Sequence, residues 1–276
     1  MLRRARPWVP AIALAAALLP AGAAPAADQP EAVDRSALRV CSDPGNMPFS
    51  NVKGEGFENK IAELLAARLG VPVKYVWFPQ ATGFLRNTLR ARRCDLVVGI
   101  PSGAELVLNT NPYYRSTYVM VTRTADEIAA DSLDAPALKT LRIGLIAGTP
   151  PASAAARNGL MAHVRPYDLL TDTRYDSPSR RMVEDLVAGT IDVALLWGPL
   201  GGYFAAQHGD LLTVTPLLQE PKSSRMDYYI AMGVRPGETH WKSDIDTLIR
   251  DNKDAILAIL RDYHVPLLDV QGKLMH

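Results

Sequence analysis

Few residues of this chain have the types and spacing that catalysis requires. Acid–base catalysis needs a proton donor and a proton acceptor held together in a cleft, and histidine most often supplies one of them. The five histidines lie at positions 163, 208, 240, 264 and 276, and none stands at the end of a predicted strand that faces a cleft. Glu105 is the one acid in the turn after the strand predicted over 95–100, and we expect it to be solvated. The sequence therefore predicts a protein that is not an enzyme.

Metal and nucleic-acid chemistry are supported no better. Asp168, Asp172 and Asp176 are spaced by four, but they lack the Asp/Asn/Gly order of a calcium loop. No Cys or His stands at zinc-ligand spacing around Cys41 and Cys94. Nucleic-acid binding would require a basic patch, but the formal net charge is only +1 and the sequence shows no such patch. We expect no cofactor, no metal and no nucleic-acid partner.

Strands and helices alternate along the chain, and they must position whatever site exists. Buried or alternating apolar runs predict strands over 38–41, 73–77, 95–100, 118–122, 142–146, 164–167, 191–197, 211–214 and 228–234. Helices are predicted over 58–69, 83–91, 179–188, 199–208 and 243–262, and another opens at Thr149-Pro150-Pro151 with Thr as its N-cap. Strands separated by helices indicate right-handed βαβ units, so we predict an α/β fold with mostly parallel sheets.

The N-terminus has the pattern of a secretion signal. Arg3, Arg4 and Arg6 precede an apolar run over 8–19, and small residues follow up to position 26. The apolar run is shorter than the roughly 20 residues that span a bilayer. Removal of residues 1–26 takes away three arginines and no acid, which changes the net charge from +1 to −2. We expect an exported, periplasmic protein that is not embedded in the membrane; an uncleaved anchor is the alternative.

Four motifs carry a family resemblance. They are CSDPGNMPFSN at 41–51, GEGFENKIAELLA at 54–66, RCDLVVGIPSG at 93–103 and TNPYYRSTYV at 110–119. In them the chain resembles the bacterial solute-binding proteins of family 3, and within that family the MoxJ/XoxJ group that is encoded beside quinoprotein alcohol dehydrogenases. The resemblance implies a two-lobed periplasmic-binding-protein fold of type II, each lobe a mostly parallel sheet flanked by helices. Lobe 1 would comprise 38–122 plus 222–276 and lobe 2 would comprise 123–221, with a cleft between them.

The same fold bears on the two cysteines, Cys41 and Cys94. The strands beside which they stand would lie in one sheet, and an oxidising compartment permits them to pair. A Cys41–Cys94 disulfide is therefore expected, with two buried free thiols as the alternative.

The polar groups that hold an amino acid in this family are missing from the matching positions. No arginine lies between Arg93 and Arg115, where the family carries the arginine that pairs with the α-carboxylate. The turn at Thr149 is followed by two prolines, which remove two N–H donors. Trp197 stands where the family's aspartate would meet the α-ammonium group. A zwitterionic amino acid is therefore not the expected ligand.

The residues left to line the cleft are mainly aromatic. The candidates are Phe49, Trp77, Phe78, Tyr113, Tyr114 and Trp197, with Asn46, Gln80, Ser102, Arg115 and Thr149 as polar points. Trp197 and Tyr113 are favoured because they stand at strand ends. Ordinary roles are the alternative: core packing for each aromatic, an ion pair for Arg115 and turn geometry for Asn46. Such a cleft suits an uncharged or apolar group, or a side chain of a partner protein.

Three functional hypotheses follow. The resemblance implies an accessory protein of a PQQ-dependent alcohol dehydrogenase and its cytochrome c, which would bind the dehydrogenase or a segment of it and aid its maturation or activation. The alternative is the substrate-binding protein of an ABC importer for a small molecule that is not an amino acid. The third is an enzyme, because some relatives on this fold are dehydratases.

Overall fold

The structure is a computed structural model, and it describes residues 33–221 and 223–275. The predicted signal segment, residues 1–26, lies outside the described residues. The described residues belong to a single compact unit. No helix within the described ranges is both long and apolar enough to cross a membrane.

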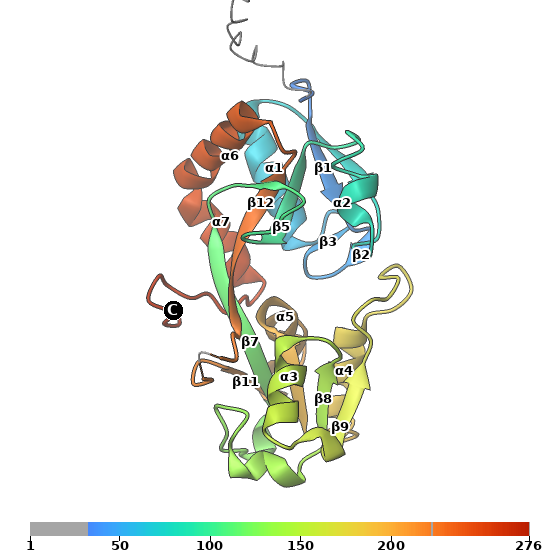
Figure 1. The fold of residues 1–276 in the computed structure, drawn as a ribbon, viewed down its shortest axis with the longest axis vertical. Coiled ribbons are helices and arrows are strands. Elements are labelled where there is room, and N and C mark those ends of the chain that lie inside the picture. Colours follow the sequence, from blue (N-terminus) through green and yellow to red (C-terminus); the bar gives the residue numbers. More distant parts are fainter. Residues whose placement is uncertain (1–32, 222, 276) are drawn as a thin grey trace, which may run out of the picture. The chain divides into compact units, whose positions relative to one another are not determined.

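The strands of the first lobe lie side by side in the order β4-β1-β5-β12 (Figure 1). They are β1 (Leu38–Ser42), β4 (Val73–Trp77), β5 (Leu96–Pro101) and β12 (Asp227–Val234), and the short β6 (Leu108–Asn109) also pairs with β12. β4, β1 and β5 are parallel, whereas β12 comes from the C-terminal part of the chain and pairs antiparallel to β5. Two separate segments of the chain therefore build this lobe.

The second lobe repeats the parallel arrangement. Its strands are β8 (Ile143–Ile146), β9 (Val164–Tyr167), β10 (Val193–Trp197) and β11 (Leu212–Pro216). β10, β8 and β9 pair in parallel in that order. A small antiparallel hairpin, β2 (Gly45–Asn46) with β3 (Ser50–Asn51), stands apart from the main sheet.

The long strand β7 (Tyr114–Arg123) belongs to both lobes. Its residues 114–117 pair with β12, and its residues 118–123 pair with β10 and β11, all antiparallel. The prediction placed a shorter strand at 118–122, and the extra residues of β7 join the two lobes into one continuous mixed sheet. The predicted α/β architecture is confirmed, while the exact lobe boundaries stay a prediction.

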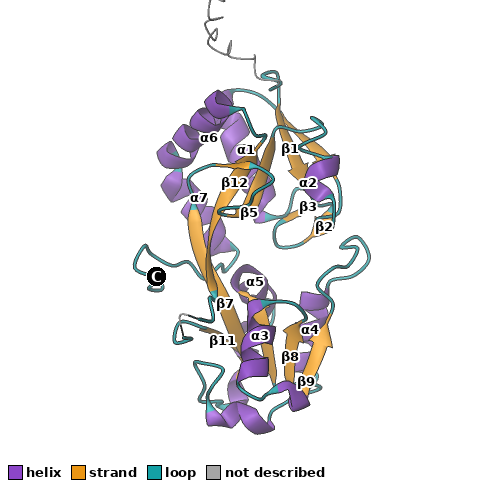
Figure 2. Ribbon diagram, in the orientation of Figure 1, coloured by secondary structure: helices purple, strands orange, loops and turns teal. Residues whose placement is uncertain are grey.

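The helices flank this sheet (Figure 2). They are α1 (Phe57–Leu69), α2 (Phe84–Asn87), α3 (Pro150–Arg157), α4 (Pro178–Val187), α5 (Gly198–Ala206), α6 (Thr239–Asp251) and α7 (Lys253–Asp262). In the first lobe, α1, α6 and α7 share one apolar core with the sheet, and α2 packs on the opposite side with the two cysteines.

Two helix predictions were wrong in extent. The helix predicted over 83–91 ends at Asn87, where the Thr88 hydroxyl donates to the carbonyl of Phe84 at 2.7 Å and the chain turns. The single helix predicted over 243–262 is divided at Asn252. The Asn252 side chain donates to the Leu248 carbonyl at 2.8 Å and accepts from Arg68 Nε at 2.8 Å, so it serves contacts outside a straight helix.

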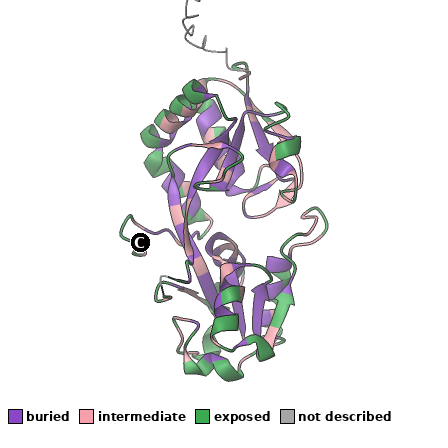
Figure 3. Ribbon diagram, viewed as in Figure 1, coloured by how far each residue is buried: buried purple, intermediate pink, exposed green. Residues whose placement is uncertain are grey.

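Successive side chains of each strand face opposite sides of the sheet, as the strand period of two requires. In β1, Leu38 and Val40 enter the core under α1, α6 and α7, whereas Cys41 enters the smaller core beside α2. In β7, Val119 packs toward α4 and α5, and Met120 packs toward α3. The buried strands consequently lie between helices whose outer faces are exposed (Figure 3).

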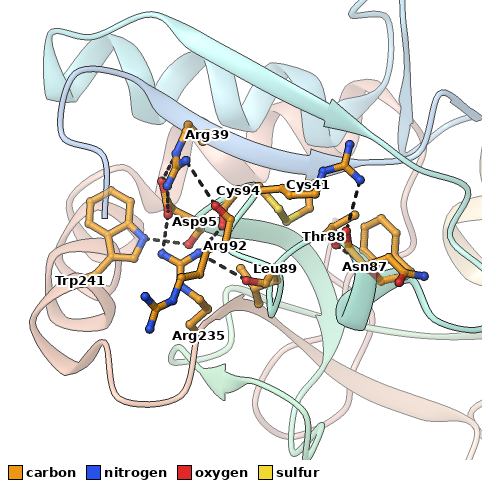
Figure 4. The surroundings of a disulfide bond; sticks show 12 residues. Arg39, Cys41, Asn87, Thr88, Leu89, Arg92, Cys94, Asp95, Arg235 and Trp241 are labelled. Atoms are coloured by element: carbon orange, nitrogen blue, oxygen red, sulfur yellow. Dashed lines mark hydrogen bonds and ion pairs between the residues drawn. A yellow bond between two sulfur atoms is a disulfide. The ribbon is translucent and has the colours of Figure 1, made fainter. Parts of the chain in front are cut away.

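The predicted disulfide between Cys41 and Cys94 is confirmed (Figure 4). The disulfide connects β1, which contains Cys41, to the segment just before β5, which contains Cys94, and the two Cα atoms are 5.5 Å apart. The cross-link joins positions 53 residues apart in the sequence, so it stabilises the fold by restricting the unfolded chain.

The buried carboxylate of Asp95 lies beside the disulfide and joins three segments of the first lobe (Figure 4). It is 1% exposed, and it accepts hydrogen bonds from Arg39 at 2.6 and 2.7 Å and from Arg235 at 2.5 Å. Trp241 of α6 donates its indole N–H to the backbone carbonyl of Asp95 at 2.9 Å, and Arg235 also donates to the carbonyl of Cys94. This network ties β1 and β5 to the segment that follows β12.

We expect Asp95→Asn to lower the free energy of unfolding by about 3–5 kcal/mol, because it leaves two guanidinium groups facing a neutral amide in a buried site. Urea denaturation followed by circular dichroism measures this. The matched control is Asp244→Asn, which removes a carboxylate that pairs with Arg35 at 2.7 Å but is 49% exposed. The control should lose about 1 kcal/mol or less. Equal losses in the two variants would contradict the role assigned to Asp95.

Candidate functional site

A cavity of about 300 Å³ lies where strands of the two lobes meet. Its walls come from β5, β7, β10 and β12, from the first turn of α1 and from the β2–β3 hairpin. The residues that line it are Asn46, Phe49, Glu58, Gln80, Gly99, Ile100, Pro101, Tyr114, Tyr118, Trp197, Tyr228 and Ile230. Most are aromatic or aliphatic, and Glu58 is the one acidic or basic side chain among them. We name this space the inner cavity.

A second cavity of about 200 Å³ adjoins the first and is more polar. The two share Asn46, Phe49, Gln80, Tyr118 and Trp197. The second cavity adds hydroxyl groups at the starts of α3 and α4 and in the loop before α4; these belong to Thr149, Thr171, Thr173, Ser177 and Ser179. We name it the outer cavity, and the two cavities together form the cleft.

Three aromatic rings form the wall between the lobes. Trp197 is the last residue of β10, and the register of the sheet places it opposite Tyr118 of β7. Their ring centroids are 5.3 Å apart, and Tyr228 of β12 lies 5.9 Å from Trp197 on the other side. Both pairs meet edge to face, which is a favourable arrangement of aromatic rings. Burial raises the pKa of the Tyr118 phenol, so it stays neutral.

Several residues of the inner cavity were not predicted as site residues; among them are Tyr118 and Tyr228 of the aromatic wall and the acid Glu58. Glu58 was predicted only as the start of an amphipathic helix, yet this residue is only 6% exposed. Burial, with a smaller contribution from the negative charge of Asp43, raises the pKa of Glu58 to about 8. Within the described residues, no hydrogen bond or ion pair reaches its carboxyl group.

Close backbone approaches hold Glu58 in this position. A Cβ atom placed on Gly56 would lie 2.1 Å from the carbonyl oxygen of Phe49, so only glycine lets α1 begin against the hairpin. The first amides of α1 then donate to the hairpin, from Phe57 to Pro48 at 2.8 Å and from Glu58 to Phe49 at 2.9 Å. A Cβ atom on Gly99 would lie 2.1 Å from Glu58 Oε1. A glycine inside a strand often indicates that another group lies close to its backbone, so Gly99 is the signal in the sequence for the contact with Glu58.

The structure brings six of the predicted site residues together at the cleft. Asn46, Phe49, Gln80 and Trp197 line both cavities, Tyr114 lines the inner cavity and Thr149 lines the outer cavity. Asn46 and Gln80 also bond to each other, with Asn46 Nδ2 3.3 Å from Gln80 Oε1. Their roles in ligand binding stay a prediction.

The other five predicted residues line neither cavity. Trp77 stacks on Tyr75 with ring centroids 4.6 Å apart, and Phe78 packs against the core beside the disulfide. Ser102 is exposed, and its amide donates to the carbonyl of Tyr229 at 2.8 Å. Trp77 and Phe78 thus make the packing contacts that were their alternative role, while ligand contact by Trp77, Phe78 and Ser102 stays a prediction.

Tyr113 and Arg115 lie around a separate hollow near the C-terminal segment. Arg115 pairs with Asp227 at 2.8 Å, and its guanidinium group lies 4.9 Å from the ring of Tyr229. It also donates to the backbone carbonyls of Asp269 and Val270 at 3.3 Å. Arg115 thus anchors the C-terminal segment, which matches the ion-pair alternative for this residue.

Within the part of the chain that the structure describes, no cationic side chain lines the cleft to hold a carboxylate. No Lys or Arg is among the described residues that line either cavity. Thr149 stands at the N-cap of α3 as predicted, but its hydroxyl donates to the carbonyl of Ile146 at 2.6 Å instead of accepting from the helix. Pro150 and Pro151 then begin α3 without N–H groups.

A direct contact closes one side of the cleft. Asp43, which is 2% exposed, accepts hydrogen bonds from the amide of Gly45 at 2.9 Å and the amide of Gln80 at 2.5 Å. The hydroxyl of Thr173, in the loop between β9 and α4, reaches the same carboxylate at 2.5 Å. Figure 1 shows this loop extending from the second lobe toward the hairpin of the first.

The raised pKa of Glu58 predicts a pH-dependent stability. In the native state Glu58 keeps its proton up to about pH 8, whereas the unfolded chain loses it near the ordinary value of 4.5. The native state binds more protons between these limits, so the contribution of this group to stability falls as the pH rises. Glu58→Gln cannot ionise. We expect its free energy of unfolding to gain on the wild type by up to about 1.4 kcal/mol per pH unit between pH 5 and 8.

Urea denaturation at pH 5, 6, 7 and 8 measures this difference between Glu58→Gln and the wild type. The matched control is Glu63→Gln on the same helix, since the Glu63 side chain is 49% exposed and pairs with Lys60. The curves of the control and the wild type should stay parallel. A Glu58→Gln curve that is also parallel to the wild type would show that Glu58 titrates normally.

Comparison with known proteins agrees with this architecture. The family model of the bacterial extracellular solute-binding proteins, family 3, matches residues 38–263. Protein MoxJ of Methylorubrum extorquens is 30% identical over 254 residues, which cover 87% of this chain and 84% of that protein.

Solved structures show the same fold. The periplasmic binding protein XoxJ from Methylobacterium extorquens AM1 is 43% identical and superimposes with a TM-score of 0.71, over 84% of this chain and 99% of that one. MxaJ from Methlophaga aminisulfidivorans MPT is 24% identical, with a TM-score of 0.72 over 84% of this chain and 100% of its own. The chain therefore belongs to the bacterial extracellular solute-binding proteins of family 3, within their MoxJ/XoxJ-like group.

Proposed function

We propose that this protein is a periplasmic accessory protein of a PQQ-dependent methanol or alcohol dehydrogenase system. It binds the dehydrogenase, or a segment of it, in the cleft and aids its maturation or activation. The similarity to the MoxJ/XoxJ group supports this proposal, and the cytochrome c of the system is a second candidate partner. The protein catalyses no reaction itself and does not carry amino acids.

The observation that carries this proposal is the chemistry of the cleft. Phe49, Tyr114, Tyr118, Trp197 and Tyr228 form its inner wall, and no cationic side chain within the described residues stands ready for an α-carboxylate. Buried aromatic pockets of this kind are where partner side chains anchor in protein interfaces. A free amino acid would bury its carboxylate there without a counter-charge, which is costly.

The rim of the cleft supports a protein as the ligand. The loop between β9 and α4 lines the outer cavity through Thr171 and Thr173. The same loop exposes three large apolar side chains, because Leu169, Leu170 and Tyr175 are 56%, 62% and 82% exposed. Apolar residues gathered in one exposed place often mark a surface that a protein partner covers.

An absence of acid–base pairs supports a binding role. None of the histidines that the structure describes lines either cavity. Among the described residues that line the inner cavity, Glu58 has no second acidic or basic side chain beside it that could complete a catalytic pair.

The alternative function is that of an ABC-importer substrate-binding protein for a small molecule that is not an amino acid. The size of the inner cavity, about 300 Å³, favours this alternative, because small-molecule pockets begin at about that volume. The two functions differ in what remains bound after purification.

Affinity capture of the tagged protein from periplasmic extract of its native cells tests the proposal. Mass spectrometry of the captured material should identify the PQQ-dependent dehydrogenase or its cytochrome, and native mass spectrometry should find no small molecule in stoichiometric amount. Trp197→Asp removes the central ring of the aromatic wall, against which a partner side chain would pack, so we expect it to reduce recovery of the dehydrogenase at least tenfold.

The matched control is Leu211→Asp, which adds the same charge to an apolar side chain that is 63% exposed and lines neither cavity. It should recover the dehydrogenase normally. A stoichiometric small ligand without any protein partner would replace the proposal by the importer alternative. Normal recovery by a folded Trp197→Asp variant would remove the cleft from the interface.

A further inference from the structure

Two carboxyl groups beside the cleft, those of Glu58 and Asp43, form no ion pair within the described residues. Glu58 is 6% exposed, lines the inner cavity and is reached by no hydrogen bond or ion pair within the described chain. Asp43 lies close enough for its charge to affect Glu58, and the hydrogen-bond donors to Asp43 are the neutral groups of Gly45, Gln80 and Thr173. Arg174, in the same loop as Thr173, already binds Asp172 through paired contacts. A buried acid without a partner is costly and indicates a missing ligand group.

The walls around Glu58 suit a cation more than a neutral group. The rings of Phe49, Tyr118, Trp197 and Tyr228 line the same cavity. Aromatic faces carry negative charge density and attract ammonium and guanidinium groups, most strongly where water is excluded. A neutral alcohol would satisfy the carboxyl group but would gain no electrostatic attraction from the rings or from the nearby carboxylate of Asp43.

We propose that the inner cavity binds a cationic side chain, lysine or arginine, of a polypeptide segment, with its stem among the aromatic rings and its charged end at the Glu58 carboxylate. The proposal rests on the proposed function for the identity of the protein that carries this segment. The inner cavity, at about 300 Å³, has room for one long side chain. The adjoining outer cavity, with the hydroxyls of Thr149, Ser177 and Ser179, offers hydrogen bonds to the backbone of such a segment.

A free amino acid does not fit equally well. Its α-carboxylate would enter a cleft in which the described lining residues include no Lys or Arg, and in which the first turn of α3 lacks two N–H groups. An arginine or lysine inside a polypeptide carries neither an α-carboxylate nor an α-ammonium group. The cavity favours a cation and lacks groups that would bind an α-carboxylate, and the two features together point to a side chain of a protein.

Isothermal titration calorimetry with capped amino acids tests this inference. The probes are N-acetyl-arginine amide, its uncharged analogue N-acetyl-citrulline amide, and free arginine. We expect the capped arginine to bind at least tenfold more tightly than the capped citrulline and than free arginine. Equal binding of arginine and citrulline derivatives would overturn the cationic assignment. Free arginine that binds as tightly as its capped form would overturn the polypeptide source.

Glu58 variants provide the second readout. Glu58→Gln should bind the two capped probes equally, while Glu58→Asp keeps the charge and should retain part of the discrimination. Glu63→Gln on the exposed face of α1 should behave as the wild type. Circular dichroism confirms that each variant is folded. Full discrimination by folded Glu58→Gln would contradict the role of this residue.

The pH dependence of binding gives an independent check. A cation should bind the ionised form of Glu58, so its affinity should rise by about tenfold per pH unit up to about pH 8. The other groups that face Glu58 are Asp43 and the phenols of Tyr75, Tyr113 and Tyr114. Burial raises the pKa of all three phenols, so they do not titrate in this range. Affinity that is flat between pH 6 and 8 would contradict the proposal.

The outcomes separate this inference from the proposed function. Capture of the dehydrogenase, together with equal binding of capped arginine and citrulline, would refute the cationic site and leave the proposed function standing. Discrimination that depends on Glu58, without any capture of the dehydrogenase, would support the cationic site and refute the proposed partner.

Discussion

The first lobe depends on the buried carboxylate of Asp95. It follows the disulfide residue Cys94, precedes β5 and binds guanidinium groups from Arg39 near the start of the domain and Arg235 near its end. A carboxylate this deeply buried is tolerated only when it is paired, so the position of β5 depends on Arg39 of β1 and on Arg235, which follows β12. The cleft shares this dependence, because Gly99–Pro101 of β5 and Tyr228 of β12 form part of its wall.

The site is built where the two lobes exchange strands. β7 carries Tyr114 and Tyr118 past the inner cavity, and its antiparallel register with β10 places Trp197 opposite Tyr118. Close backbone contacts at Gly56 and Gly99 bring the first turn of α1, and with it Glu58, to the same place. The result is an aromatic wall with one acid in it, which neither lobe could form alone.

Local patterns in the sequence predicted what depends on neighbouring residues. The strands at Val73–Trp77 and Val164–Tyr167 have the predicted bounds. The motif resemblance added the two-lobed arrangement and the Cys41–Cys94 disulfide, both of which are confirmed.

Long-range contacts decided the rest. The helix break at Asn252 involves Arg68, which is 184 residues away in the sequence, and the burial of Glu58 of α1 depends on Gly99 of β5. Arg115 was predicted for the cleft, yet it follows Tyr114 in a strand whose successive side chains face opposite sides, and it pairs with Asp227 outside the cleft. The residue pattern of a single segment cannot predict such contacts.

The strand β7 also determines how the two lobes can move. It is hydrogen-bonded to β12 along residues 114–117 and to β10 and β11 along residues 118–123, so its passage between the lobes is paired ribbon and not loop. Hinge motions usually concentrate in a few loop or terminal residues that absorb the dihedral change. Here a change in the angle between the lobes requires a change of twist along β7 and the strands that are hydrogen-bonded to it. The aperture of the cleft therefore depends on the twist of this ribbon.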